Sequence, residues 1–371
     1  MDEHITRRKS RQVKVRGILI GGNAPISIQS MTKTDTRDVG ATCSEIERLE
    51  KAGCEIIRMA IPDEEAARAV AKIRSKTDMP LVADIHFNYR LGLMALDAGV
   101  DKIRINPGNT PERGLKELAS ACLKYRVPVR IGVNSGSVSK DLIAKHGGRS
   151  AFALVESAVI SARLLEDMGL SDIVISLKAS DPLTTIQAYR EMAKIADYPL
   201  HLGLTEAGSP WAGAIKSSVA LGVLLADGIG DTIRVSLTGD PVEEVRVGRE
   251  ILRALKLRKG GVEIISCPTC GRCRVGLRFL SEVAQEVDKR TGHLEVPLKV
   301  AIMGCEVNGP GEAQEADVGL AIGKGRGLLF VKGKPVRQMA QEEFIPVLLN
   351  EISKLAGGHM VSNTDGNGES R

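Results

Sequence analysis

Short apolar runs alternate with amphipathic stretches over the first two thirds of the chain. The stretches at 43–54, 63–78 and 150–169 place apolar residues every three to four positions, which predicts helices. Several of these stretches end in the glycine that is typical just past a helix. The runs between them are rich in β-branched residues and predict eight strands, at 25–31, 55–60, 80–86, 101–107, 128–134, 172–178, 199–206 and 231–237.

Eight strand and helix repeats over about 250 residues have the size of a TIM (β/α)8 barrel. An open, doubly wound sheet is the alternative. It does not need eight units, and no GxGxxG follows the first strand, so we predict the closed barrel. The run VKVRGILIGG at 13–22 predicts an extra hairpin that caps the bottom of the barrel.

A second pattern begins after the segment RKGGVE at 258–263, which we interpret as a linker. The later segments predict a small α+β domain. We therefore expect a substrate-binding barrel at 1–258, a second domain at 262–358, and a disordered tail rich in Ser, Asn and Gly at 359–371. Within the second domain the expected elements are helices at 276–290 and 342–358, strands at 297–305, 317–323 and 327–336, and a loop at 306–316.

Composition narrows the function classes. The net charge of +5 is modest for 371 residues, and aromatic residues make up only 3%, so the stacking platforms of a nucleic-acid binder are missing. No apolar run approaches the roughly 20 residues of a membrane helix, and the polar N-terminus lacks the core of a secretory signal. We expect a cytoplasmic enzyme with a small anionic substrate, no nucleic acid and no membrane.

Barrel enzymes carry their chemistry at the C-terminal ends of the strands. One arginine at such a position is usually a solvated charge, but several cations that converge on one pocket cost energy unless an anion compensates them. Guanidinium groups match phosphate oxygens, so we predict a diphosphate ligand. Glu206 is the acid that could move a proton. The predicted substrate-binding residues are Arg58, Asp84, His86, Arg104, Asn106, Arg130, Asn134, Lys178, Ser180, Arg234 and Ser236.

The sequence SCPTCGRC at 266–273 places three thiols within eight positions, and Cys305 ends a later strand. Disulfides are rare in the cytoplasm, so these cysteines point to a metal centre. A zinc ribbon would need a second CxxC or a histidine pair, although His293 could complete a zinc site. A thioredoxin-like redox pair would need another order of elements. Thiols flanked by glycine-rich loops favour a [4Fe-4S] cluster on Cys267, Cys270 and Cys305.

The fourth ligand has two candidates. Glu312 offers a carboxylate in the glycine-rich loop, and a hard oxygen on a soft cluster is weakly matched, which would make one iron accessible to substrate. Cys273 would instead complete an all-cysteine set and close the cluster. Cys43, Cys54 and Cys122 have the surroundings of ordinary packed thiols.

Five motifs together resemble those of the bacterial 4-hydroxy-3-methylbut-2-enyl diphosphate synthases of the non-mevalonate isoprenoid pathway. The similarity extends over the chain except its two termini, and motifs of this length are highly specific. It implies a barrel joined to a domain like half of a sulfite or nitrite reductase. The motifs are VADIHF at 82–87, RINPGN at 104–109, HLGLTEAG at 201–208, SCPTCGR at 266–272 and MGCEVNGPGEAQEADVG at 303–319.

The resemblance also implies the chemistry. The substrate would be 2-C-methyl-D-erythritol 2,4-cyclodiphosphate, opened reductively with loss of a hydroxyl as water. The cluster would be held by Cys267, Cys270, Cys305 and Glu312, with Glu206 and Glu312 as catalytic residues. Reduced flavodoxin or ferredoxin would supply the electrons one at a time. A head-to-tail homodimer would close each barrel with the partner's cluster domain.

Cys273 departs from the pattern of that family and leaves the all-cysteine ligand set open. Two other interpretations also remain. One is a barrel lyase or transferase that acts on an anionic substrate and carries a structural zinc domain. The other is a non-enzymatic iron-sulfur sensor. The colour and the metal content of anaerobically purified protein would separate these readings.

Overall fold

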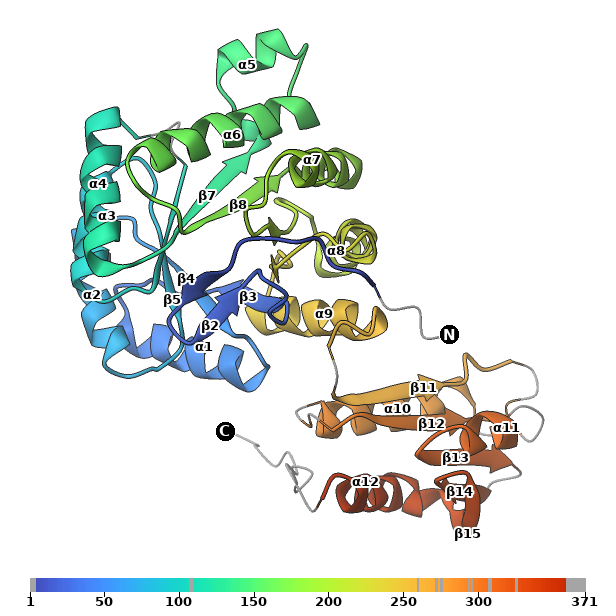
Figure 1. Cartoon of the computed structure of the whole chain (residues 1–371). Coiled ribbons are helices and arrows are strands. Elements are labelled where there is room, and N and C mark those ends of the chain that lie inside the picture. The colour runs from blue at the N-terminus through green and yellow to red at the C-terminus, as the bar shows by residue number, and fades with distance from the viewer. Residues whose placement is uncertain are drawn as a thin grey trace. The chain divides into compact units, whose positions relative to one another are not determined.

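The computed structural model describes residues 5–106, 110–258, 260–270, 273, 276–292, 294, 296–305, 309–323 and 326–357. The chain divides into two compact units, with the division after Arg258 (Figure 1). Each unit has a hydrophobic core of its own. Among the described residues, no helix combines the length and the apolar character that crossing a bilayer would require.

The first unit is a barrel of parallel strands, as the alternating pattern predicted. The sheet has eight strands in the order β8-β7-β6-β5-β4-β3-β10-β9, and a parallel bridge between Ile175 and Leu200 joins its two edges. The strands are β3 (Ser27–Met31), β4 (Ile56–Ala60), β5 (Leu81–Asp84), β6 (Lys102–Ile105), β7 (Val129–Asn134), β8 (Ile173–Lys178), β9 (His201–Leu202) and β10 (Thr232–Ile233).

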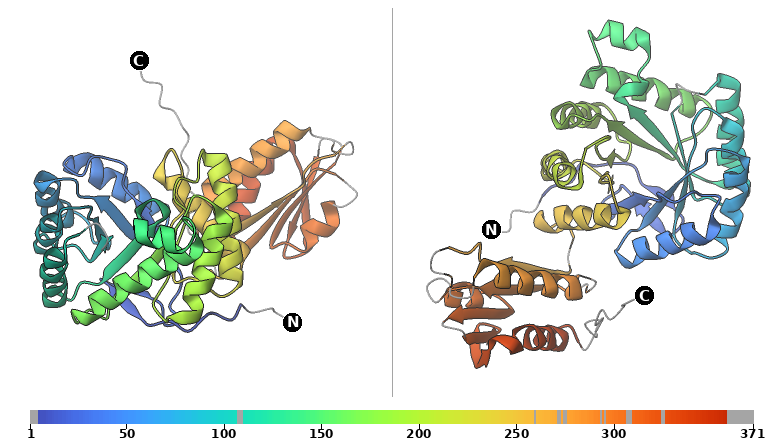
Figure 2. Two further views of the ribbon diagram at one scale, coloured as in Figure 1. Left: turned by 90° about the horizontal axis from the view of Figure 1, so that it is seen from above. Right: turned by 180° about the vertical axis from the view of Figure 1, so that it is seen from behind.

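Helices surround this barrel, and the short α5 lies on the outer side of α6 (Figure 2). Side-chain caps define where several begin. The carboxylates of Asp63 and Asp181, for example, accept hydrogen bonds from the first turns of α2 and α7. The helices are α1 (Val39–Lys51), α2 (Glu64–Arg74), α3 (Tyr89–Asp97), α4 (Glu112–Tyr125), α5 (Lys140–Lys145), α6 (Ala151–Asp167), α7 (Pro182–Ile195), α8 (Pro210–Ala226) and α9 (Pro241–Ala254).

The last two barrel strands are shorter than the apolar runs at 199–206 and 231–237 predicted. Pairing continues one step past their ends, because the Arg234 amide donates to the Leu202 carbonyl at 2.9 Å. At the next residue, Gly203, a β-carbon would overlap the Arg234 carbonyl and lie 2.8 Å from Nζ of Lys178. Beyond this point the backbone makes isolated hydrogen bonds rather than a regular ladder, such as that from the Thr205 amide to the Ala179 carbonyl at 3.2 Å.

A hairpin closes the N-terminal end of the barrel, as predicted from 13–22. Strands β1 (Val13–Val15) and β2 (Ile18–Ile20) pair antiparallel. Val15 and Ile20 are buried against Ile56 and Val82, which lie near the beginnings of β4 and β5. An apolar plug therefore forms the floor of the barrel.

The second unit is a five-stranded mixed sheet in the order β11-β12-β13-β14-β15, in which the first three strands are parallel. Buried residues of α10 and α12, such as Leu280 and Phe344, share one core with the sheet. The elements are β11 (Val262–Ser266), α10 (Leu277–Thr291), β12 (Leu298–Met303), α11 (Gly309–Gln314), β13 (Val318–Gly323), β14 (Arg326–Val331), β15 (Lys334–Ala340) and α12 (Phe344–Leu355).

Three expectations for this unit were wrong. The linker expected at 258–263 runs into a strand that was not expected, β11, which begins at Val262. The single strand expected at 327–336 is a hairpin, because Lys332 and Gly333 both have positive φ angles, 48° and 74°, and reverse the chain. The loop expected at 306–316 contains the short helix α11. The tail expected at 359–371 lies outside the described residues.

Candidate functional site

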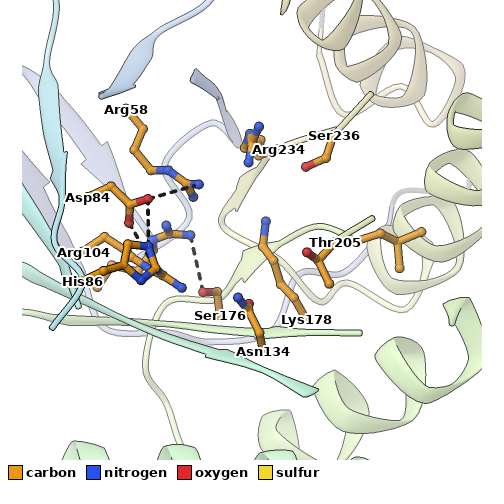
Figure 3. Close-up of a pocket in the computed structure, with 12 residues that line it drawn as sticks. Arg58, Asp84, His86, Arg104, Asn134, Ser176, Lys178, Thr205, Arg234 and Ser236 are labelled. Atoms are coloured by element: carbon orange, nitrogen blue, oxygen red, sulfur yellow. Dashed lines mark hydrogen bonds and ion pairs between the residues drawn. The ribbon is translucent and has the colours of Figure 1, made fainter. Parts of the chain in front are cut away.

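A pocket opens at the C-terminal ends of the barrel strands (Figure 3). Its empty space, counted out to the open mouth, is about 420 Å³. Most of the lining is polar or charged. The lining residues are Arg58, Asp84, His86, Arg104, Arg130, Asn134, Ser176, Lys178, Leu204, Thr205, Arg234 and Ser236.

Asp84 organises one side of the pocket. One carboxylate oxygen lies 3.1 Å from Nη1 of Arg104, and the other lies 3.6 Å from Nη2 of Arg58 and 3.4 Å from Nε2 of His86. Burial alone would raise the pKa of Asp84, but Arg58, His86 and Arg104 outweigh it and hold the pKa well below its usual value. Asp84 is therefore a fixed anion that orients the guanidinium groups.

The other basic groups of the pocket do not contact Asp84 in an ion pair. Glu244 of α9 lies 3.5 Å from Arg234. Within the described part of the chain, neither Arg130 nor Lys178 has an ion-pair partner. Burial, followed by the positive charges of Arg234 and Arg130, lowers the pKa of Lys178 well below its usual value. Burial also lowers the pKa of Arg58, to about 10. A dianion in the pocket would relieve this repulsion.

Two glycines make room for the cations. A β-carbon at Gly132 of β7 would lie 2.5 Å from Nε of Arg104, and one at Gly203 would lie 2.8 Å from Nζ of Lys178. Strand residues two apart face the same side, so both glycines point into the barrel beside the pocket. Their missing side chains let the two basic groups reach the mouth.

The structure gathers most of the predicted substrate-binding residues in this one pocket. Asn106, buried at the end of β6, and Ser180, exposed after β8, are outside the lining set. Sequence reasoning missed Ser176 and Leu204 and did not select Thr205. Ser176 could have been predicted, because it lies two residues before Lys178 and therefore faces the same inward side of β8.

Glu206 follows Thr205 of the lining but is itself exposed. Its φ of 54° is left-handed, a conformation that a glutamate disfavours. Such backbone strain concentrates at functional sites. The carboxylate therefore lies beside the pocket rather than inside it.

The second unit places cysteines at one edge of its sheet. Cys267 directly follows β11, and its amide donates to Ile302 of β12 at 3.0 Å. Cys305 lies two residues after β12, so parallel strands bring both thiols to the same edge. The Cys273 amide donates to the Cys270 carbonyl at 2.9 Å, so these two residues lie close together. Glu312 is exposed on α11.

Cys273 lies close to Gly304, the residue before Cys305. A β-carbon at Gly304 would lie 2.8 Å from Sγ of Cys273. Among the described residues, no three Cys, His, Asp or Glu side chains converge closely enough to hold a single metal ion. A cluster binds each ligand through a different iron, so its ligands can stand farther apart. His293, the zinc alternative, lies outside the described residues.

Known proteins match along most of the chain. The family model described as GcpE TIM-barrel domain matches residues 10–249, and that described as GcpE protein C-terminal domain matches 263–354. A protein of Geobacter sulfurreducens named 4-hydroxy-3-methylbut-2-en-1-yl diphosphate synthase (flavodoxin) is 53% identical over 94% of this chain and 98% of its own length. A protein of the same name from Caldanaerobacter subterraneus is 54% identical over the same shares.

Some solved structures are similar in fold over about two thirds of the chain. A dihydropteroate synthase from Stenotrophomonas maltophilia has a TM-score of 0.51 at 15% identity, covering 67% of this chain and 98% of that protein. A type I 3-dehydroquinate dehydratase from Clostridium difficile has the same TM-score at 16% identity and the same coverage. Likeness at this level of identity shows the fold and carries nothing about substrate.

Proposed function

This chain belongs to the GcpE family, and on that premise we propose that its barrel pocket binds 2-C-methyl-D-erythritol 2,4-cyclodiphosphate. It is an enzyme that forms 4-hydroxy-3-methylbut-2-en-1-yl diphosphate in isoprenoid biosynthesis. The observation that carries the assignment of the pocket is the pair of buried basic groups, Arg130 and Lys178, neither of which forms an ion pair among the described residues. A compact dianion would compensate the charge of Arg130 and favour the protonated form of Lys178.

The reaction is a balanced reduction. Counted on the neutral acids, the cyclic diphosphate takes up two electrons and two protons and releases one water. A carbon–oxygen bond to phosphate breaks as the ring opens, and the departing hydroxyl takes a proton. A bound iron-sulfur cluster would supply the electrons one at a time.

The chain's own residues hold the substrate and move the proton. Arg58 and Arg104, oriented by Asp84, together with Arg130 and Lys178 are the basic groups that we assign to the phosphates. Asn134 and Ser236 offer neutral hydrogen bonds at the mouth. Asn106 and Ser180 remain predicted contacts. Glu206, next to the lining, would donate the proton to the leaving hydroxyl.

The donor set of the second unit fits a thiolate-bound [4Fe-4S] cluster. Cys267, Cys270 and Cys305 lie at or near one sheet edge, and we assign the fourth position to Glu312. The position of Cys273 beside Gly304 keeps the all-cysteine set in competition. Iron analysis and electron paramagnetic resonance of a Cys273→Ser variant separate the two. An unchanged cluster supports Glu312, and cluster loss would assign Cys273 as a ligand. Reduced thiols of this kind suit the cytoplasm.

We propose a homodimer as the working assembly, head-to-tail, with a reduced flavodoxin or ferredoxin as electron donor. One surface supports self-association. Trp211, Ile215 and Val219 follow one another at intervals of four on α8 and are 79%, 49% and 49% exposed. An apolar stripe of this kind on a helix commonly marks an interface.

Turnover tests the proposal directly. Anaerobically reconstituted protein should convert the cyclic diphosphate to the linear one with reduced flavodoxin, as followed by phosphorus NMR. Lys178→Met should raise KM about 10- to 100-fold, because it removes a charge-assisted contact. Lys72→Met on the exposed side of α2 is the matched control. Colourless, zinc-bearing protein without turnover would favour the lyase, and a brown protein without turnover would favour the sensor.

A further inference from the structure

The barrel lumen stays polar below the pocket. Lys102 and His201 are fully buried, and Gln29 nearly so. Among the described residues, Nζ of Lys102, both ring nitrogens of His201 and both amide atoms of Gln29 have no hydrogen-bond partner in the protein. None of the three lines the pocket. Buried polar groups are normally satisfied, so this set requires an explanation.

Strand register places Lys102 between the pocket and the floor of the barrel. Lys102 precedes Arg104 by two residues on β6, so it faces inward about 7 Å deeper. Its neighbour in register on β5 is Val82, which packs against the apolar plug of the N-terminal hairpin. The amine is therefore enclosed by hydrocarbon below and by the cationic pocket above.

The charges that face Lys102 are positive. Arg130 on β7, Arg58 on β4 and Arg104 on its own strand lie toward the pocket. The imidazole of His201 on β9 is a titratable but uncharged neighbour. The nearby carboxylate, Asp84 on β5, is engaged by Arg58, Arg104 and His86. Burial, followed by Arg130 and Arg58, holds the pKa of Lys102 well below its usual value. His201 is likewise kept neutral, since burial and then Arg130 and Lys178 lower its pKa.

We propose that Lys102 takes up a proton when the anionic substrate enters the pocket above it, so that binding and protonation of the lumen are coupled. Two negative charges close to Arg58, Arg104 and Arg130 cancel the field that these groups impose on the amine. Screening inside a closed barrel is weak, so the change reaches one layer down. Lys178 lines the pocket, so it would contact the substrate directly, and the same loss of repulsion favours its protonation.

The chemistry of the ligand makes this uptake measurable. Each phosphorus of the cyclic diphosphate carries one strongly acidic oxygen, so the ligand stays a dianion throughout the neutral and alkaline range. Any proton taken up on binding then belongs to the protein. Affinity should fall as pH rises, by tenfold per pH unit for each proton taken up.

Calorimetry of the cluster-loaded full-length protein, without electron donor, tests the coupling. Binding enthalpies of the cyclic diphosphate in buffers of different ionisation enthalpy give the number of protons taken up. Lys102→Met should reduce that number by about one and flatten the pH dependence of affinity by the same amount. Gln29→Met, which removes a buried polar group that does not titrate, should leave both unchanged. Circular dichroism checks that each variant is folded.

The outcomes distinguish this inference from the proposed function on which it rests. Absence of binding to the wild-type protein would overturn the substrate and this coupling with it. Binding with equal proton uptake in wild type and Lys102→Met would overturn the coupling alone. A loss of uptake in His201→Gln with none in Lys102→Met would overturn the assignment to Lys102.

Discussion

Glu206 combines a carboxylate beside the pocket with a backbone that suits glycine, at φ 54°. Glu206→Gly should therefore raise the free energy of unfolding by about 1 kcal/mol, because it relieves the left-handed strain. The same change should lower turnover by about 100- to 10,000-fold if the carboxylate moves a proton. Denaturant unfolding and steady-state kinetics measure the two effects.

The conservative variant Glu206→Gln is the control for the two effects expected of Glu206→Gly, on stability and on turnover. It keeps the strain and the side-chain shape, so stability and the visible absorbance of the cluster should stay at the wild-type level while turnover falls. Normal turnover in Glu206→Gln would remove this residue from the mechanism.

Gly203 is the second single-residue prediction. Gly203→Ala places a β-carbon against the Arg234 carbonyl and 2.8 Å from Nζ of Lys178. We expect a destabilisation of about 1–3 kcal/mol and a rise in KM of at least about tenfold, since Lys178 must move. Gly222→Ala on α8, where a β-carbon would meet nothing within 4 Å, is the control. Equal KM values in the two variants would contradict the positioning role.

Residue chemistry explains which parts of the pocket the sequence could predict. Charged residues at strand ends, such as Arg58 and Lys178, were recognisable because barrels collect those ends at one mouth. Leu204 could not be recognised in this way, because an apolar residue near the end of a strand usually belongs to the hydrophobic core. The exact neighbours of Asn106 and Ser180 depend on loop geometry, which the pattern of strands does not determine.

At the scale of elements, the alternating pattern predicted the barrel and its bottom hairpin but overestimated β9 and β10. Apolar runs mark burial, and burial continues where ladder pairing stops, as it does around Gly203. The residues Lys332–Gly333 form the turn of the hairpin. A glycine between two strand-like segments indicates such a turn, but 327–336 was expected to be one continuous strand. Helix α11 is rich in glycine and proline, which have low helix propensity, so its sequence did not predict a helix. Packing against the rest of the unit stabilises it instead.

The hairpin that closes the barrel floor allows a matched test. Ile20→Ala should lower the free energy of unfolding by about 2–5 kcal/mol, because Ile20 is fully buried in the plug. Leu19→Ala, one residue earlier and 40% exposed, should cost less than about 1 kcal/mol. Similar losses in the two variants would show that the hairpin is not a packed plug. Chemical denaturation of both variants provides the comparison.

At the scale of the whole molecule, the chemistry is divided between two units. The cationic pocket belongs to the barrel and the cysteines belong to the mixed sheet, each with its own core. Substrate binding and electron supply can therefore be separated by experiment, and turnover requires both.

Self-association is the prediction at this scale. Ile215→Glu puts a charge into the exposed stripe of α8 and should convert a dimer to a monomer in light scattering, with turnover falling in parallel. Leu123→Glu, an exposed apolar residue on α4, should change neither. A wild-type monomer, or a dimeric Ile215→Glu protein, would contradict the assignment of this surface.

The chain contains one tryptophan, and it is Trp211, 79% exposed at the start of α8. All indole fluorescence of the protein therefore comes from one point, six residues beyond the pocket-lining Thr205. In water that emission lies at long wavelength, and covering the ring would shift it to the blue. The protein thus carries a built-in optical reporter, and its emission maximum as a function of dilution reads out how much of this helix is covered.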